Sequence, residues 1–243
     1  MTDERKQPIQ DRQFQSDTMS RPGMESTISL TMQHLASIAI TVEEMLVQAR
    51  YSLAEGYENT KEKVYQQILQ YLRIETHHGI INTGANINNF VYATISPIID
   101  DFICNTTRAT VDLHNGGRLV SENCETGGDE EFVVLDRMSA TGADYIPIIQ
   151  AKTASLGAAM GQCLSALRGM GNRGVVYGFV TTGGSWWMLS YDGRTFQVTH
   201  DIAVVFDTMA TNKEKWMKEF SVLVDCVYAA LRNGGSIVVD VAI

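Results

Sequence analysis

The hydrophobic positions of the chain change their period near its middle. Between residues 30 and 103, apolar residues recur at steps of three and four, which is the spacing of one face of an α-helix. From residue 118 onward, short apolar runs alternate with glycine-containing turns, and that pattern is typical of β-strands. The sequence therefore predicts a helical first part and a second part that contains a sheet.

Three amphipathic stretches make up the first part. The first runs from residue 30 to about 56, and the second from a capping sequence at 59–62 to about residue 79. The third begins near residue 86 and contains Pro97, which we expect to kink or restart the helix because proline has no amide hydrogen. These helices could form a coiled-coil dimerisation arm or a bundle packed on the second part, and the heptads are too few to decide.

The second part follows the order β-β-β-α-β-β-β-α. The predicted strands are 118–123, 131–136, 145–152, 175–182, 185–192 and 194–200, with a final strand at 237–243. One predicted helix starts near residue 156, and another starts at a capping box at 211–214. This order predicts an α/β fold with a mixed sheet flanked by helices and a crossover helix after the third strand.

The domain organisation follows from these patterns. Residues 1–27 are polar and of mixed charge, and we expect them to form a disordered tail. Residues 28–80 are the predicted helical extension, and residues 81–243 are the predicted α/β domain. No stretch approaches the length of about 20 apolar residues that a membrane span needs, and the N-terminus lacks the apolar segment of a secretory signal.

Net charge and cysteine content limit the classes of function that the sequence supports. The 243-residue chain has a formal net charge of −9, so it does not attract nucleic acid through its overall field and would need a basic patch or a bridging metal ion. Its four cysteines are far apart and lack zinc-site spacing. We interpret them as reduced thiols in a cytoplasmic or nuclear protein.

The candidate chemistry lies around the sequence YIPIIQAK. Gln150 and Lys152 are two residues apart on a predicted strand, so they project from the same face. Six carboxylates precede them in a short stretch: Glu122, Glu125, Asp129, Glu130, Glu131 and Asp136. Adjacent carboxylates repel each other unless water or a cation screens them, and a Mg²⁺ ion with oxygen ligands is one way to use such a cluster.

This arrangement resembles the PD-(D/E)XK nuclease superfamily. In that pattern an acid on one strand is followed by (D/E)-x-K at the end of the next strand and by a helix that carries glutamine. Here the corresponding residues are Glu131 or Asp136, then Gln150 and Lys152, then Gln162. The stretch VVYGFVTTGGSWWMLSYDGRTFQVT is also similar to uncharacterised fungal members of the superfamily. The resemblance covers about residues 85–232 and implies a restriction-endonuclease-like fold.

The resemblance also implies a mechanism, which is Mg²⁺- or Mn²⁺-dependent hydrolysis of phosphodiester bonds, with DNA as the expected substrate. Glu131 or Asp136 would be the first metal ligand, Glu131 being favoured, and Glu122 a second carboxylate. Gln150 would supply an amide oxygen, Lys152 would position or polarise the attacking water, and Gln162 would orient a ligand or touch the nucleic acid.

The residue at position 150 departs from the family pattern, and this departure supports a second interpretation of the function. The family pattern has an acid where this chain has Gln150, and a neutral amide binds Mg²⁺ without contributing charge. A second interpretation is therefore a catalytically inactive nuclease-fold protein that binds a protein partner through helices within residues 31–75. A third is a helical homo-oligomer that carries a small β-domain, in which Lys152 is an ordinary surface lysine and Gln162 faces solvent.

Overall fold

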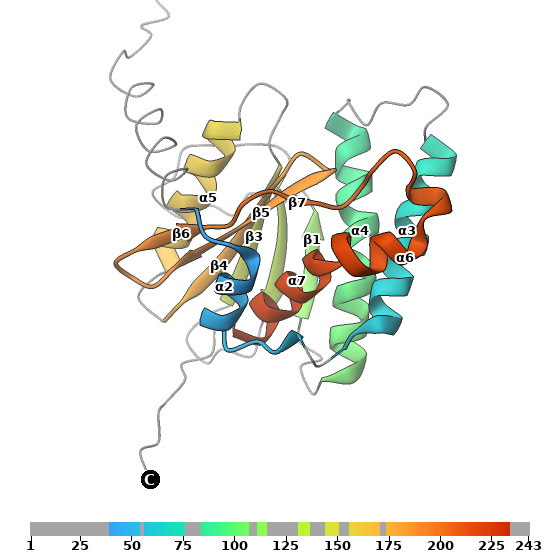
Figure 1. Cartoon of the computed structure of the whole chain (residues 1–243). Coiled ribbons are helices and arrows are strands. Elements are labelled where there is room, and N and C mark those ends of the chain that lie inside the picture. The colour runs from blue at the N-terminus through green and yellow to red at the C-terminus, as the bar shows by residue number, and fades with distance from the viewer. Residues whose placement is uncertain are drawn as a thin grey trace, which may run out of the picture.

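The computed structural model describes residues 39–53, 56–75, 84–106, 111–115, 131–136, 144–150, 156–170 and 174–233. Within these ranges the chain is a mixed α/β fold, as the sequence predicts, with helices packed on a sheet (Figure 1). No helix in these ranges is long and apolar enough to cross a membrane.

Seven described strands form one sheet in the order β1-β2-β3-β4-β5-β6, with β7 paired to β5. Their bounds are β1 Val111–Asn115, β2 Glu131–Asp136, β3 Asp144–Gln150, β4 Val176–Thr181, β5 Ser185–Tyr191, β6 Phe196–Val198 and β7 Ile202–Ala203. All described pairs are antiparallel except β3 with β4. The parallel pair is joined by the crossover helix α5, Leu156–Met170, which is where the sequence predicts a crossover.

The other helices lie on the opposite side of the sheet from α5, and those that have buried residues share one large cluster with the sheet. They are α2 Val42–Gln48, α3 Glu58–Glu75, α4 Gly84–Asn105, α6 Lys213–Lys215 and α7 Val222–Asn233. A short 3-10 turn, Met209–Thr211, precedes α6, and a π-helical turn, Trp216–Phe220, connects α6 to α7. Figure 1 shows α7 crossing the sheet, with α3 and α4 beside it.

Residue alternation along the strands separates two cores. Phe179, Trp186 and Met188 face the layer of α2, α3, α4 and α7 and belong to one large buried cluster with those helices. Val180 and Leu189 face the other way and pack against α5 in a smaller cluster. Because α2 and α3 bury their apolar faces in the large cluster, they are part of the same core as the sheet.

The structure differs from the local predictions in several places. In the stretch 30–56, the described helix is only Val42–Gln48, and Ile40 forms a β-bridge with Thr199. Helix α3 begins at Glu58, ahead of the predicted capping sequence at 59–62, and the short strand β7 was not predicted.

The first strand of the sheet is Val111–Asn115, which the sequence analysis did not predict, while the predicted strands at 118–123 and 237–243 lie outside the described residues. Helix α4 continues through Pro97, so the helix does not restart there; the neighbouring Ile95 and Ile98 are fully buried, and this packing outweighs the lost backbone hydrogen bond.

Another difference is at the start of the C-terminal helix. The predicted capping box at 211–214 does not form, because Asn212 is the residue before α6 and makes no capping hydrogen bond through its side chain. Trp216 is buried and donates from Nε1 to the carbonyl of Val204 at 2.9 Å. This tertiary contact coincides with the π-turn. A capping box does form at α2, between Thr41 and Glu44, and the sequence analysis did not predict it.

Candidate functional site at one end of the sheet

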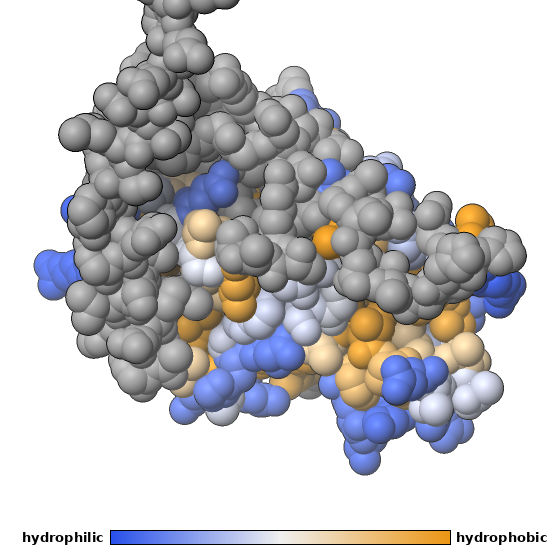
Figure 2. Space-filling model, turned by 90° about the horizontal axis from the view of Figure 1, so that it is seen from above, coloured by the Kyte–Doolittle hydropathy of each residue, from blue (hydrophilic) through white to orange (hydrophobic). Residues whose placement is uncertain are grey.

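The candidate site lies at the end of the sheet where β1, β3 and β4 finish and β2 and β5 begin. Asn115, Glu131, Gln150, Thr181 and Ser185 are the strand residues at this end, which we call the polar sheet end. In Figure 1 it is the upper end of the sheet. Figure 2 looks down on it and shows hydrophilic and hydrophobic residues interspersed over the coloured part of the surface.

Strand register brings two of the predicted site residues together. Glu131 is paired with Ile149, and Gln150 is the next residue along β3. Gln150 is in turn paired with Thr181 of β4. Regular alternation gives Glu131 and Gln150 positions on opposite faces of the sheet. A single cation that both residues bind must therefore sit over the end of the strands.

Asp136 occupies the opposite end of β2. It is paired with Asp144 of β3 and Val111 of β1, at the far end of both strands from Gln150. Six residues of extended strand separate Asp144 from Gln150, which corresponds to roughly 20 Å. Glu131 and Asp136 therefore cannot both bind the same ion together with Gln150, and the register favours Glu131.

Gln162 lies on α5, which begins at Leu156, six residues after β3 ends. The side chain of Gln162 is half-buried, and six residues of helix set it about 9 Å along the axis from that first residue. Lys152 and Glu122, the remaining predicted site residues, lie outside the described residues.

The wall of the site beside Gln150 is a tightly fixed turn. Thr181 is fully buried, and its hydroxyl donates to the carbonyl of Ser185 at 3.0 Å while accepting from the amide of Gly183 at 2.9 Å. Trp186 donates from Nε1 to the carbonyl of Gly183 at 2.9 Å. Gly183 has a φ of 92°, which favours glycine, and a Cβ on Gly184 would lie 2.9 Å from Val205 Cγ2. The turn therefore holds the end of β4 in one conformation.

The polar sheet end offers oxygen atoms as possible metal ligands. A glutamate carboxylate and a glutamine amide oxygen are both ligands that Mg²⁺ accepts. The residue types thus fit a hard cation, although among the described residues no group of three or more His, Cys, Asp or Glu side chains is close enough together to hold a metal ion.

A second polar cluster, which the sequence analysis missed, lies buried between the helices. Asp225 of α7 is 2% exposed; Lys61 of α3 forms an ion pair with it at 3.0 Å, and Tyr51 donates to it at 3.1 Å. Burial raises the pKa of Asp225, and the nearby charge and hydrogen bond of Lys61 offset this only in part. The signal in the sequence is the single acid in the apolar run VLVDCVY.

Asp101 of α4 forms the other half of this cluster. It accepts a short hydrogen bond from the hydroxyl of Tyr228 and lies 4.0 Å from the ammonium of Lys63. Burial alone would raise the pKa of Asp101, but hydrogen bonds from Tyr228, Thr60 and Asn105 lower it overall. Burial also raises the pKa of Tyr228 well above its usual value, so the phenol stays a donor. The two carboxylates tie α3 to α4 and α7.

Comparison of the chain with protein-family models, with curated proteins and with solved structures finds no match. Function must therefore be argued from the site itself.

Proposed function

We propose that the chain is a metal-dependent nuclease that hydrolyses phosphodiester bonds in DNA and that its fold is restriction-endonuclease-like. The proposal is supported by chain order: an antiparallel run of β1, β2 and β3 is followed by α5 and the parallel strand β4. This is the order that the resemblance to PD-(D/E)XK nucleases implies. The observation that carries the proposal is the register, which brings Glu131 and Gln150 to the same end of the sheet.

Each residue has a distinct role in this proposal. The Glu131 carboxylate and the Gln150 amide oxygen hold the cation, and Gln162 orients a ligand or the nucleic acid. Lys152 orients the attacking water and offsets the negative charge that develops on the phosphate. A bound Mg²⁺ or Mn²⁺ ion supplies Lewis acidity and lowers the pKa of its water.

The decisive experiment is cleavage of plasmid and single-stranded DNA in the presence of Mn²⁺. We expect the wild-type chain to cut and both Glu131→Gln and Lys152→Ala to lose activity. Asp136→Asn is the matched control, because it removes one carboxylate from the same strand at the far end from Gln150. Loss of cleavage in Asp136→Asn with retention in Glu131→Gln would reverse the assignment of the first ligand.

A second candidate function is favoured by one observation, which is that position 150 carries an amide. Loss of a charged ligand contact costs about 1–3 kcal/mol, which is roughly a tenfold to hundredfold loss of metal affinity. In this alternative the chain is a catalytically inactive nuclease fold that binds a protein partner. Since α2 and α3 bury their apolar faces in the large cluster, the partner would contact their outer faces.

The variant Gln150→Glu separates the two functions. If it cuts DNA and the wild-type chain does not, the amide has silenced a nuclease fold and the second function is favoured. If neither protein cuts and neither binds Mn²⁺, the nuclease proposal fails.

A further inference from the structure

The end of β3 is held in the sheet from one side. Gln150 is the last residue of this strand, and it is paired with Thr181 of β4. On the other side, β2 begins at Glu131, which is paired with Ile149, so among the described strands only β4 lies beside Gln150. The position of Gln150 in the sheet therefore depends on how the end of β4 is held.

The end of β4 is fixed by the side chain of Thr181 itself. This residue is fully buried, and its hydroxyl donates to the carbonyl of Ser185 at 3.0 Å and accepts from the amide of Gly183 at 2.9 Å. The carbonyl of Gly184 accepts from the amide of Val204 at 2.9 Å, which ties the turn to the segment after β7. A single buried hydroxyl thus closes the turn as both donor and acceptor.

Removal of this hydroxyl would be felt at Gln150. The amide of Gly183 and the carbonyl of Ser185 would lose a partner, and an unsatisfied polar group in the interior is costly. The turn is therefore expected to rearrange, which releases Thr181 from its place at the end of β4. Since β4 is the described strand beside Gln150, we expect the end of β3 to loosen with it.

We propose that Thr181 is a positioning residue for the cation site, because its buried hydroxyl fixes the end of β4 and thereby holds Gln150 at the end of β3. This assignment rests on the proposed function, since Gln150 is a metal ligand only in that proposal. It requires no contact between Thr181 and the cation. Any effect of Thr181 on the cation must therefore pass through Gln150.

The first test needs no metal. In the full chain labelled with ¹⁵N-glutamine, the heteronuclear NOE of the Gln150 backbone amide measures the mobility of the end of β3, and Gln150→Glu assigns the signal. We expect Thr181→Val, which keeps the shape and removes the hydroxyl, to lower this NOE. Thr181→Ser keeps the hydroxyl and should leave the NOE near the wild-type value. An unchanged NOE in Thr181→Val would overturn the proposal.

Thr199→Val is the matched control for this measurement. Thr199 is also almost completely buried, and its hydroxyl accepts from the amide of Met188 at 3.0 Å, in the middle of β5. The variant removes an equally buried hydroxyl away from the polar sheet end, so the NOE of Gln150 should not change. An equal fall in both variants would indicate a general loosening of the sheet and contradict the proposal.

The second test is the dissociation constant for Mn²⁺, measured by EPR of the free ion. We expect Thr181→Val to weaken binding about fivefold, the factor that one hydrogen bond of typical strength is worth. Thr181→Ser and Thr199→Val should stay near wild type. In a Gln150→Ala background, Thr181→Val should have no further effect, because its influence passes through Gln150. A further loss there would show another route and overturn the proposal.

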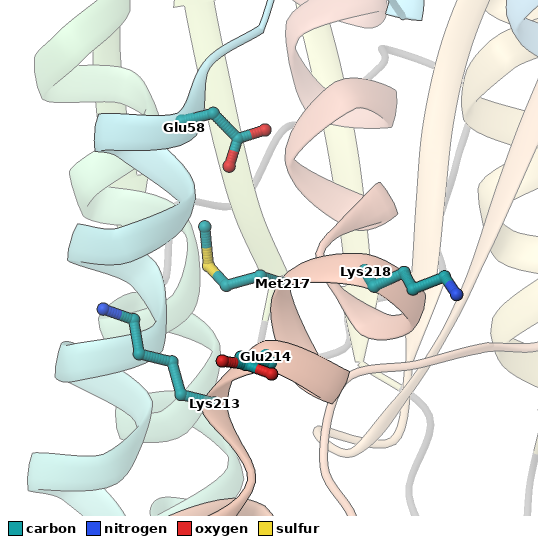
Figure 3. A pocket seen from close by; sticks show the side chains of 5 residues that line it. All are labelled: Glu58, Lys213, Glu214, Met217 and Lys218. Carbon is teal, nitrogen blue, oxygen red and sulfur yellow. The ribbon is translucent and has the colours of Figure 1, made fainter.

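Binding of Mn²⁺ to other carboxylates is separated by a variant outside the site. Figure 3 shows a hollow of about 550 Å³ beside the start of α3, with Glu58 and Glu214 in its lining and no lining residue from the polar sheet end. Glu214→Gln should therefore leave the Mn²⁺ affinity near wild type. A loss equal to that of Thr181→Val would show that the titration reports surface carboxylates, and would contradict the site.

The two readouts also distinguish this proposal from the nuclease function. If the wild-type chain binds no Mn²⁺ and the NOE of Gln150 responds as expected, the nuclease proposal fails although Thr181 does hold Gln150. If the wild-type chain binds Mn²⁺ and the NOE does not respond to Thr181→Val, the cation site stands and the role of Thr181 is refuted.

Discussion

Among the described residues, the two faces of the sheet are covered by layers of unequal thickness. On one face, α2, α3, α4 and α7 build a large cluster that contains Phe90, Phe102, Trp186 and Trp216, all almost completely buried. On the other face, described packing comes mainly from α5, with small buried residues such as Ala159 and Cys163. Buried area scales with stabilisation, so the thick layer carries most of the hydrophobic stabilisation that the described residues contribute.

The thick layer also contains the buried charges. Lys61, Asp101 and Asp225 are each less than 10% exposed and lie where helices of this layer meet. The crossover helix on the thin side, by contrast, starts six residues after Gln150. The comparison separates the two: the thick layer carries the buried charges, whereas the proposed chemistry lies at the end of the strands, with Glu131 and Gln150 at positions on opposite faces.

The largest expected effect comes from breaking the buried ion pair in the thick layer. Asp225→Ala leaves the Lys61 ammonium buried without its partner, which should lower the free energy of unfolding by about 3–5 kcal/mol. Urea unfolding at pH 7 measures this. The double variant Lys61→Met with Asp225→Leu removes both charges and should recover most of the loss. Failure of the double variant to recover would mean that the cost is one of packing.

The next smaller effect is the difference in unfolding free energy between two equal side-chain deletions, one on each face of the sheet. Ile98 in α4 and Leu167 in α5 are both fully buried, and substitution of either by alanine removes the same number of carbon atoms. Each should lower the free energy of unfolding by about 2–5 kcal/mol, with Ile98→Ala at the upper end, because a thin layer collapses more easily around a cavity. Equal losses in urea unfolding would remove the distinction between the layers.

Much of the fold could be predicted from local signals. The helix at Leu156–Met170 and the strands at Val176–Thr181 and Ser185–Tyr191 follow hydrophobic periodicity between glycine turns, and all three are confirmed. The same signals were too short at β1, where five residues alternate, and they were overridden at the π-turn by the buried Trp216. Local patterns predict an element well only where no tertiary contact competes with them.

The candidate site, too, could be predicted from the sequence only in part. The sequence pattern identified Glu131 and Asp136 as alternative first ligands, and the resemblance favoured Glu131, but the local pattern could not show which of them lies beside Gln150, because that depends on which strand ends meet. Only the register with β3 shows that Glu131 is beside Gln150 and Asp136 is not. The buried pairs of Asp101 and Asp225 were equally out of reach, since their partners lie on α3 and α7, more than 100 residues away in sequence.

The smallest expected effect concerns the pH dependence of the two buried carboxylates. The pKa of Asp101 is lowered in the folded chain by hydrogen bonds that overcome burial, so its ionised form stabilises the fold and that contribution is lost as the pH falls. The pKa of Asp225 is raised by burial, so its contribution has the opposite sign: it is present at low pH and is lost as the pH rises through the folded-state value.

Neutral variants should therefore change the acid response in opposite directions. Between pH 6 and pH 3, Asp101→Asn should lose less unfolding free energy than wild type, by about 1 kcal/mol, the scale of a typical hydrogen bond. Asp225→Asn should lose more than wild type over the same range. The other groups facing these carboxylates are Lys63 and Tyr228 at Asp101, and Lys61, Tyr51 and Glu58 at Asp225, and none is changed by either variant. Parallel urea titrations of the three proteins test the signs. If both variants change the loss of unfolding free energy at low pH in the same direction, the two carboxylates titrate as one coupled network and do not have opposite pH dependences.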